Sequence, residues 1–249
     1  MMKIIISKLL SNFMILQGKL IWLSKRDTII LPNGLELHFL PETKTQVYGY
    51  MATIWKYNVY GKIEDDGIII DAGANIGVYS LKAAKKAKQV ISIEPEPEIF
   101  SFLKHNIAVN NLENVDPVNL ALSDHDGFMD FYVSRQFFGE AHEPNPRILH
   151  SAKRKYSVPC IKLDSLLLKY PGIKEVSRIK MDVEGHATKI LAGAKDTLEK
   201  GIVQNFSVAA YHYRDEEKEV KQILEDYGYV TRSKFFLDGD IILYGELKR

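Results

Sequence analysis

The stretch Ile68-Ile-Ile-Asp-Ala-Gly-Ala-Asn-Ile-Gly77 decides the fold of this chain. Its first three residues form a continuously apolar run, which predicts a short parallel strand buried on both faces. Gly73 and Gly77 then allow a tight turn and a close approach of the backbone to a ligand, before a helix expected to run to about Ala87. The spacing G-x-x-x-G matches only part of the dinucleotide fingerprint G-x-G-x-x-G, so by itself it indicates a nucleoside site of unspecified kind.

Alternating strands and helices continue from there to the C-terminus. Further strands are expected at 90–93, 115–122, 127–133, 179–182, 203–211, 229–236 and 240–246, and helices from Pro97, at 189–200 and at 215–227. This order predicts a doubly wound α/β sheet. Ligands of such sheets bind beyond the carboxyl ends of the strands, so functional residues are expected among Asp71, Glu94, Leu122–Asp124, Asp182 and Tyr211–His212.

Residues 1–60 are predicted to form an extension that packs on a core domain of residues 61–249. An amphipathic helix is expected within Met1–Lys25, and Thr28–Leu40 predicts a hairpin with Asn33-Gly34 in its turn, followed by a helix over 47–60. No uncharged run near the N-terminus is long enough to cross a bilayer, so at most peripheral membrane contact is expected there.

Within the core domain, residues 134–157 form a polar segment rich in cationic and aromatic side chains. Long inserts of this kind often act as substrate loops, and the cations would suit an anionic acceptor. A merely solvated loop remains the alternative.

The composition argues against a nucleic-acid-binding protein and against disulfide-bonded or zinc–cysteine proteins. The 249 residues include 33 Lys and Arg against 32 Asp and Glu, a formal net charge of +1, which argues against strong non-specific binding to nucleic acid. The single Cys160 excludes an internal disulfide and a cysteine-based zinc site, and it fits a reducing, cytoplasmic location.

Two carboxylates at consecutive strand ends indicate the ligand. A pyrophosphate at a helix N-terminus is opposed by a nearby anion, whereas Asp71 would suit the cationic amino end of S-adenosylmethionine. Glu94, at the end of the next expected strand, could accept hydrogen bonds from both hydroxyls of a ribose. The alternative is a helix-capping aspartate followed by a solvated glutamate.

The chain resembles the FkbM-type family of S-adenosylmethionine-dependent methyltransferases between about Val47 and Tyr213. The matching segments are, in chain order, Asp71–Gly77, Glu94–Phe100, Leu103–Ile107 with Asn110, Ala121–Asp124, Leu163-Asp164, Lys180–Gly185 and Leu191–Ala194. The resemblance implies a class I methyltransferase fold, with a seven-stranded, mostly parallel Rossmann-like sheet. It also implies methyl transfer from S-adenosylmethionine to a hydroxyl of a small molecule or glycan.

The resemblance assigns roles position by position. The loop that contains Asp71, Gly73, Asn75 and Gly77 would cradle the methionine end of the cofactor, and Glu94 would hold the ribose. The adenine would lie against Ser123 and Asp124, and Asp182 would lie next to the reacting methyl group.

An alcohol nucleophile must also lose its proton. The resemblance offers Asp182, Glu184 and His212, with His212 either as the general base or as an orienting group. These residues and His186 could in principle hold a metal, but no recognisable metal motif carries them and none is expected.

Two positions depart from the family pattern, because Ala187 and Ala210 stand where glutamates are usual. This predicts altered substrate or proton handling, a cofactor-binding protein with weak or no catalysis, or a neutral change compensated by His186 or Glu184. The remaining competitors are RNA methylation by the same fold and an NAD-dependent oxidoreductase, which the glycine spacing disfavours. The sequence predicts no stable nucleic-acid partner, and it identifies neither the acceptor nor the oligomeric state.

Overall fold

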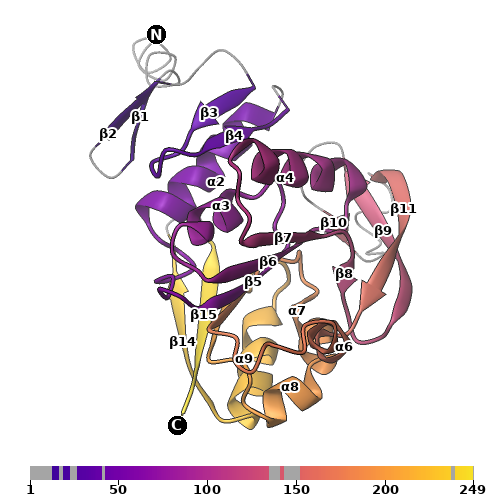
Figure 1. Cartoon of the computed structure of the whole chain (residues 1–249). Helices are drawn as coiled ribbons and strands as arrows, with labels where there is room; N and C mark the ends of the chain where they lie inside the picture. The colour runs from indigo at the N-terminus through magenta and orange to yellow at the C-terminus, as the bar shows by residue number, and fades with distance from the viewer. Residues whose placement is uncertain are drawn as a thin grey trace.

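The computed structural model describes residues 13–16, 19–22, 27–40, 43–134, 141–142, 152–236 and 239–248. A seven-stranded sheet runs through its centre (Figure 1). The strand order is β14 (Tyr229–Phe235), β15 (Ile241–Leu247), β13 (Asn205–Ala209), β12 (Arg178–Met181), β5 (Ile68–Ala72), β6 (Gln89–Ile93) and β7 (Val115–Val118). All pairs in this sheet are parallel except the two that β15 forms with β13 and β14, so the predicted doubly wound, mostly parallel Rossmann-like sheet is confirmed.

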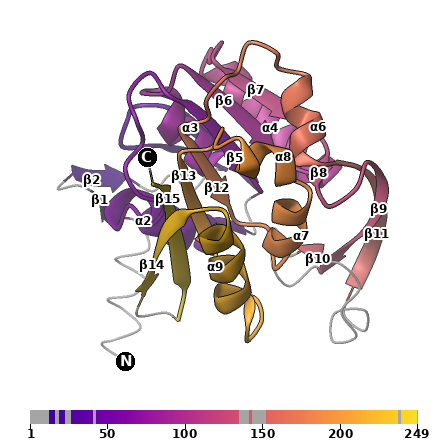
Figure 2. The ribbon, with the colours of Figure 1, turned by 90° about the horizontal axis from the view of Figure 1, so that it is seen from below.

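Helices cover both faces of this sheet, as the apolar run at its centre requires. Ile69 packs into a core with α2 (Lys44–Lys56), α3 (Val78–Ala84) and α4 (Pro97–Val109). The next residue, Ile70, points the other way, into a second core with α6 (Leu163–Leu168), α7 (Ala187–Ala192), α8 (Lys195–Glu199) and α9 (Glu216–Asp226). The view from below brings α7, α8 and α9 to the front of the sheet, with α3 and α4 behind it (Figure 2).

A second sheet, of order β10-β9-β11-β8, extends from the side of the main one. The expected strand at 115–122 is split between the two sheets, because β7 ends at Val118 and β8 (Ala121–Leu122) pairs with β11 (Ala152–Ile161). β9 (Gly127–Ser134) pairs antiparallel with β11 on one edge and with β10 (Ala141–His142) on the other.

The prediction of a loop throughout 134–157 is therefore wrong at Ser134, at Ala141–His142 and from Ala152 onward, because these residues belong to strands. Alternation explains the strand: Val158 and Cys160 are buried, while Ser157 and Pro159 between them are exposed. Residues 135–140 and 143–151 of the expected loop lie outside the described residues.

The N-terminal extension contains two small hairpins. β1 (Phe13–Leu16) and β2 (Lys19–Trp22) pair antiparallel, so the helix expected within Met1–Lys25 is wrong over these residues. Two short apolar runs separated by Gln17-Gly18 suit a strand pair better than one continuous helix. The hairpin of β3 (Thr28–Ile30) and β4 (Glu36–His38) is confirmed, although only Gly34 of its turn has a positive φ.

The extension packs directly on the core domain through α2, whose Met51 and Ile54 share a core with α3. The division at residue 60 remains a prediction. No helix in the described part of the chain is both long and apolar enough to cross a membrane.

The helix expected at 189–200 is broken into α7 and α8 at Gly193. A side chain at Gly193 would place its Cβ 2.1 Å from the carbonyl oxygen of Ser123, so only glycine lets the two segments approach this closely. At this break, the end of α7 packs directly against the backbone of Ser123 and Asp124, which follow β8.

Candidate active site

A pocket lies at the carboxyl ends of β5, β6 and β12, where the fold predicts a ligand. Its polar lining residues include Asn75, Glu94, Asp182 and Glu184. Its apolar lining residues include Ala121, Leu122, Met129, Phe131 and Ile190. A ligand that has both charged groups and a flat apolar part would fit this mixed lining.

The loop after β5 is shaped by Gly73. Its φ is +73°, and an added Cβ would lie 1.9 Å from the carbonyl oxygen of Asp182. No side chain fits there, so the loop can lie directly against the end of β12 only with glycine at this position. Asn75 also has a left-handed backbone, with φ +53°, and lines the pocket.

Glu94 is buried at the pocket wall and held by backbone N–H groups. One carboxylate oxygen accepts a hydrogen bond from the amide of Asn75 and the other from the amide of Glu96, both at 2.9 Å. Burial raises the pKa of Glu94 to about 7, although the two amide hydrogen bonds oppose the shift. Each oxygen keeps a lone pair for a further donor, which is what a ribose diol requires.

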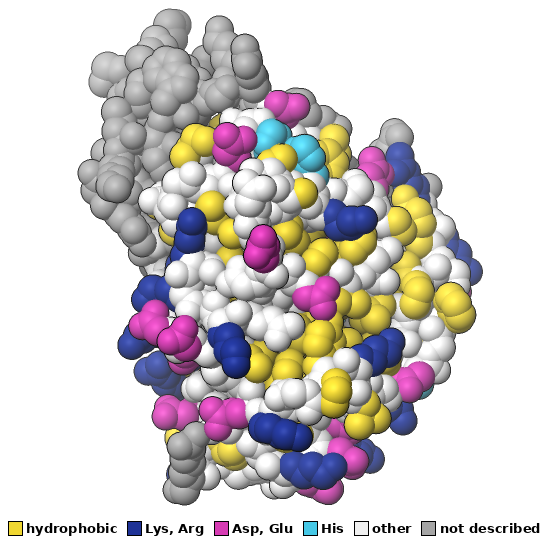
Figure 3. Space-filling model, in the orientation of Figure 1, with side chains coloured by type: hydrophobic (Ala, Val, Ile, Leu, Met, Phe, Trp, Pro, Cys, Tyr) yellow, Lys and Arg dark blue, Asp and Glu magenta, His cyan; other side chains and the backbone are white. Residues whose placement is uncertain are grey.

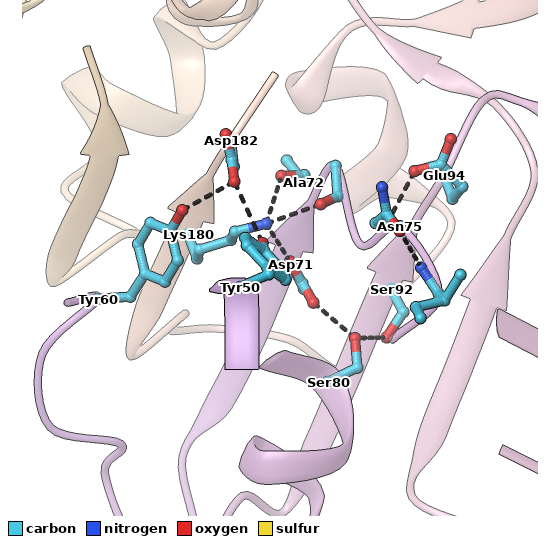
Figure 4. Close-up of polar contacts among 12 residues, drawn as sticks. Tyr50, Tyr60, Asp71, Ala72, Asn75, Ser80, Ser92, Glu94, Lys180 and Asp182 are labelled. Atoms are coloured by element: carbon cyan, nitrogen blue, oxygen red, sulfur yellow. Dashed lines mark hydrogen bonds and ion pairs between the residues drawn. The ribbon is translucent and has the colours of Figure 1, made fainter. Parts of the chain in front are cut away.

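Asp71 lies beneath the loop and does not line the pocket. Its carboxylate is fully buried, 3.0 Å from the ammonium of Lys180, and accepts a hydrogen bond of 2.6 Å from Ser80 (Figure 4). Lys180 in turn donates to the carbonyl oxygen of Gly73 at 2.7 Å. The expected contact between Asp71 and the amino group of the cofactor therefore finds no support in this geometry; Asp71 acts on the loop through Lys180.

Sequence reasoning missed Lys180, although a signal exists. It is a charged residue in a four-residue strand that is buried throughout, and the pairing of β12 with β5 places it directly beside Asp71. A lysine and an aspartate on adjacent buried strands are expected to pair, because neither charge is tolerated alone there.

Asp182 follows β12 and is fixed by two tyrosines (Figure 4). Its Oδ2 accepts hydrogen bonds from Tyr60 at 2.8 Å and from Tyr50 at 3.1 Å. Burial, followed by the charge of Asp182, raises the pKa of both phenols well above the usual value. Tyr50 belongs to α2, so the N-terminal extension supplies part of the site, which the sequence did not reveal.

His212, after β13, lies among three carboxylates. Its Nδ1 donates to Oε2 of Glu216 at 3.0 Å, while Nε2 lies 3.8 Å from Asp182 and 3.7 Å from Glu184. Burial by itself lowers the pKa of His212, but the bond to Glu216 and the charges of Glu184, Glu216 and Asp182 outweigh it and raise the pKa to about 9. The structure thus brings Asp182, Glu184 and His212 together, as expected, and adds Glu216.

The residues expected near the adenine directly follow Leu122, which lines the pocket. Ser123 is fully buried, and its Oγ lies 3.1 Å from Nε2 of His186 and 3.2 Å from Asp124. His186 lines the pocket, whereas Ser123 and Asp124 do not. Their contact with the cofactor remains a prediction.

The two departures from the family pattern are both buried in the core. Ala187 and Ala210 pack among the apolar side chains of the second core, and neither lines the pocket. The buried carboxylate that contacts His212 comes instead from Glu216, on α9.

Comparison with known proteins agrees with this architecture. A model of the FkbM methyltransferase domain matches residues 71–231. Methyltransferase 1 from Beauveria bassiana is 25% identical over 225 residues, covering 82% of this chain and 90% of that protein. Hexuronic acid methyltransferase AglP from Haloferax volcanii is 26% identical over 181 residues, covering 72% of this chain and 71% of that protein.

A solved structure shows the same fold. The crystal structure of methyltransferase FkbM from Methylobacillus flagellatus KT matches with a TM-score of 0.57 and 16% identity. The match covers 82% of this chain and 54% of that one, so the present chain spans about half the length of that relative.

Proposed function

This chain belongs to the FkbM family of S-adenosylmethionine-dependent methyltransferases, and from that membership we propose that it methylates a hydroxyl oxygen of a small molecule or glycan. The observation that carries the proposal is the pocket itself. Glu94 lies at its wall as a ribose acceptor, and Asp182, Glu184 and His212 converge at the adjoining strand ends.

The residues present fit the cofactor. Gly73 lets the loop lie directly against the end of β12 at the pocket wall, Glu94 retains acceptor capacity for the ribose, and the apolar side chains that include Leu122 and Ile190 suit a flat adenine. Bound S-adenosylmethionine supplies an electrophilic methyl group on a sulfonium. The chain itself must bind the two reactants in line, and that positioning supplies much of the rate.

The acceptor hydroxyl must lose a proton as the new carbon–oxygen bond forms and the carbon–sulfur bond breaks. Asp182, Glu184 and His212 are the groups at the strand ends that can take or direct this proton. Asp182 is held in one orientation by two phenols, so its second oxygen has a defined direction in the pocket. A comparison of Asp182→Asn with His212→Ala would separate their roles, because full activity in His212→Ala would exclude that residue as the base.

A glycan acceptor is supported by the relative from Haloferax volcanii, whose name specifies a hexuronic acid. An RNA acceptor is less well supported. On the face drawn in Figure 3, Lys and Arg are interspersed with Asp and Glu over the described residues. A surface that binds the phosphates of RNA is expected to be mainly cationic.

Calorimetric titration with S-adenosylhomocysteine, S-adenosylmethionine and NADH tests the cofactor site. We expect both adenosyl ligands to bind and Glu94→Ala to weaken them about 10–100-fold, because hydrogen bonds to a charged acceptor are lost. Glu113→Ala, an exposed carboxylate after α4, is the matched control and should leave binding unchanged. Binding of NADH alone would overturn the proposal.

Transfer of a labelled methyl group to uronic-acid glycosides, neutral glycosides and RNA tests the acceptor. Label in the glycosides that is lost in Asp182→Asn would support the proposal. Label in RNA alone would replace it with nucleic-acid methylation. Tight cofactor binding without transfer to any acceptor would favour a non-catalytic cofactor-binding protein.

A further inference from the structure

Three side chains from the segments after β12 and β13, two of which line the pocket, face one another at the spacing of metal ligands. Asp182, Glu184 and His212 each offer one atom, and these atoms lie within 4.8 Å of one another. The distances of 3.7 and 3.8 Å from Nε2 of His212 to the two carboxylates are too long for hydrogen bonds. They fall within the range of roughly 3–4.4 Å expected between atoms that ligate one cation at about 2.0–2.2 Å.

His212 is held as a ligand would be held. Its side chain is only 8% exposed, and Nε2 points toward Asp182 and Glu184 with no hydrogen-bond partner at 3.5 Å or less among the described residues. The other ring nitrogen donates to Glu216, whose carboxylate is fully buried and also accepts from the backbone amide of His212. A carboxylate behind a histidine fixes the tautomer and the ring orientation of metal-binding histidines in this way.

The two carboxylates are fixed by independent features. Both tyrosine hydroxyls bind Oδ2 of Asp182, so Oδ1 is the oxygen that faces His212. Glu184 has a left-handed backbone, with φ +53°, followed by Gly185 at φ +89°. A non-glycine residue in that conformation costs energy that the fold has to offset, and such strain concentrates at functional sites.

We propose that Asp182, Glu184 and His212 bind a divalent cation of the Mn²⁺ or Mg²⁺ class, with Glu216 positioning the histidine. Two carboxylates suit a hard cation, and the single imidazole favours Mn²⁺ over Mg²⁺. Three carboxylates surround one imidazole here, so a cation offsets an excess of negative charge. The role of the cation rests on the proposed function: it would bind the acceptor oxygen and lower the pKa of its hydroxyl.

Titration of the full chain with Mn²⁺, followed by calorimetry and electron paramagnetic resonance, tests the site. We expect one Mn²⁺ per chain, displaced by excess Mg²⁺. Binding should weaken at least 100-fold in His212→Ala and Glu184→Gln, and about 10–100-fold in Glu216→Gln. Glu184 is partly exposed, so Glu184→Gln tests the site even where His212→Ala fails to fold.

Glu36→Gln is the matched control, since Glu36 forms another carboxylate–imidazole pair, with His38, on the N-terminal hairpin. It should bind Mn²⁺ like the unmodified chain. Absence of stoichiometric binding, or equal binding in Glu184→Gln, would overturn the proposal.

A parallel titration with S-adenosylhomocysteine in the presence of a chelator separates this proposal from the proposed function. Cofactor binding without Mn²⁺ binding would overturn the cation proposal and leave the methyltransferase proposal intact. Mn²⁺ binding without cofactor binding would overturn the methyltransferase proposal and leave the cation site intact.

Discussion

The part of the pocket that we assign to the cofactor and the part that we assign to the reaction, called here the cofactor end and the reacting end, are built in different ways. At the cofactor end, one continuous loop after β5 supplies the backbone, and a glutamate at the end of the adjacent strand completes the wall. Gly73 and Asn75 contribute mainly conformation, through positive φ angles and close backbone approach. Much of this end is therefore encoded in a short stretch of sequence.

The reacting end is assembled from side chains that are far apart in the chain. Tyr50 comes from α2, Asp182 and Glu184 from the loop after β12, His212 from the segment after β13 and Glu216 from α9. None of these elements determines the geometry alone. The comparison shows that a backbone-built site is sensitive to single steric changes, whereas a side-chain-built site depends on the packing of several elements.

Breaking the buried pair beneath the cofactor loop should have the largest effect. Lys180→Met leaves Asp71 as an unpaired charge with no exposure to solvent, and removal of one partner of a buried pair costs about 3–5 kcal/mol. Urea unfolding followed by circular dichroism measures this loss. The double variant Asp71→Asn/Lys180→Met should recover most of it, and a fully stable Lys180→Met would show that the loop does not depend on the pair.

Gly73→Ala tests the backbone-built end directly. The new Cβ would meet the carbonyl oxygen of Asp182 at 1.9 Å in a left-handed conformation, so we expect a loss of about 2–4 kcal/mol in the free energy of unfolding. Gly172→Ala is the control, because a Cβ there meets nothing within 4 Å, and it should change stability by less than about 0.5 kcal/mol. Equal unfolding midpoints for the two variants would contradict the steric argument.

The pH dependence of cofactor binding tests the proposed role of Glu94 as the ribose acceptor. With a pKa of about 7, Glu94 is ionised and able to accept both ribose hydroxyls only above neutral pH. S-adenosylhomocysteine should therefore bind about tenfold more tightly at pH 8 than at pH 6. Because this pKa exceeds the ordinary 4.5, the free protein should lose stability as the pH rises from there toward 7.

Glu96 is the control for this profile, since burial also raises its pKa to about 7. Calorimetry across the pH range should show the same rise in affinity in Glu96→Gln and a flat profile in Glu94→Gln. The reverse result would assign the titration to Glu96.

The smallest effects are expected at the phenols that hold Asp182. Tyr60→Phe and Tyr50→Phe each remove one hydrogen bond to this carboxylate, at a cost of about 1–2 kcal/mol, larger for the more buried Tyr60. Tyr227→Phe, at the far end of α9, is the control. In unfolding experiments, a double-mutant cycle with Asp182→Asn should show coupling for both tyrosines, and additivity would mean that the extension does not stabilise the reacting end.

The difference between the two ends also explains which features of the fold and the site could be predicted from the sequence. The strand–loop–helix unit at 68–87 and the carboxylate at Glu94 follow from local apolar patterning and glycine positions, and the structure places them as expected in the fold. The strand at 152–157 was missed because its polar composition hid the alternation. Asp71 was assigned to the ligand because its partner, Lys180, lies 109 residues away in the chain and beside it only in the sheet.

The sequence by itself determined the α/β class, the family and the strand ends to which we assign the chemistry. These depend on short-range periodicity and on motifs that a single segment carries. Only the tertiary structure decided that α2 supplies the tyrosines on Asp182, that Glu216 lies behind His212, and that Ala187 and Ala210 lie in the core. Side-chain directions at these positions depend on how helices from separate parts of the chain pack on one sheet, which no local pattern specifies.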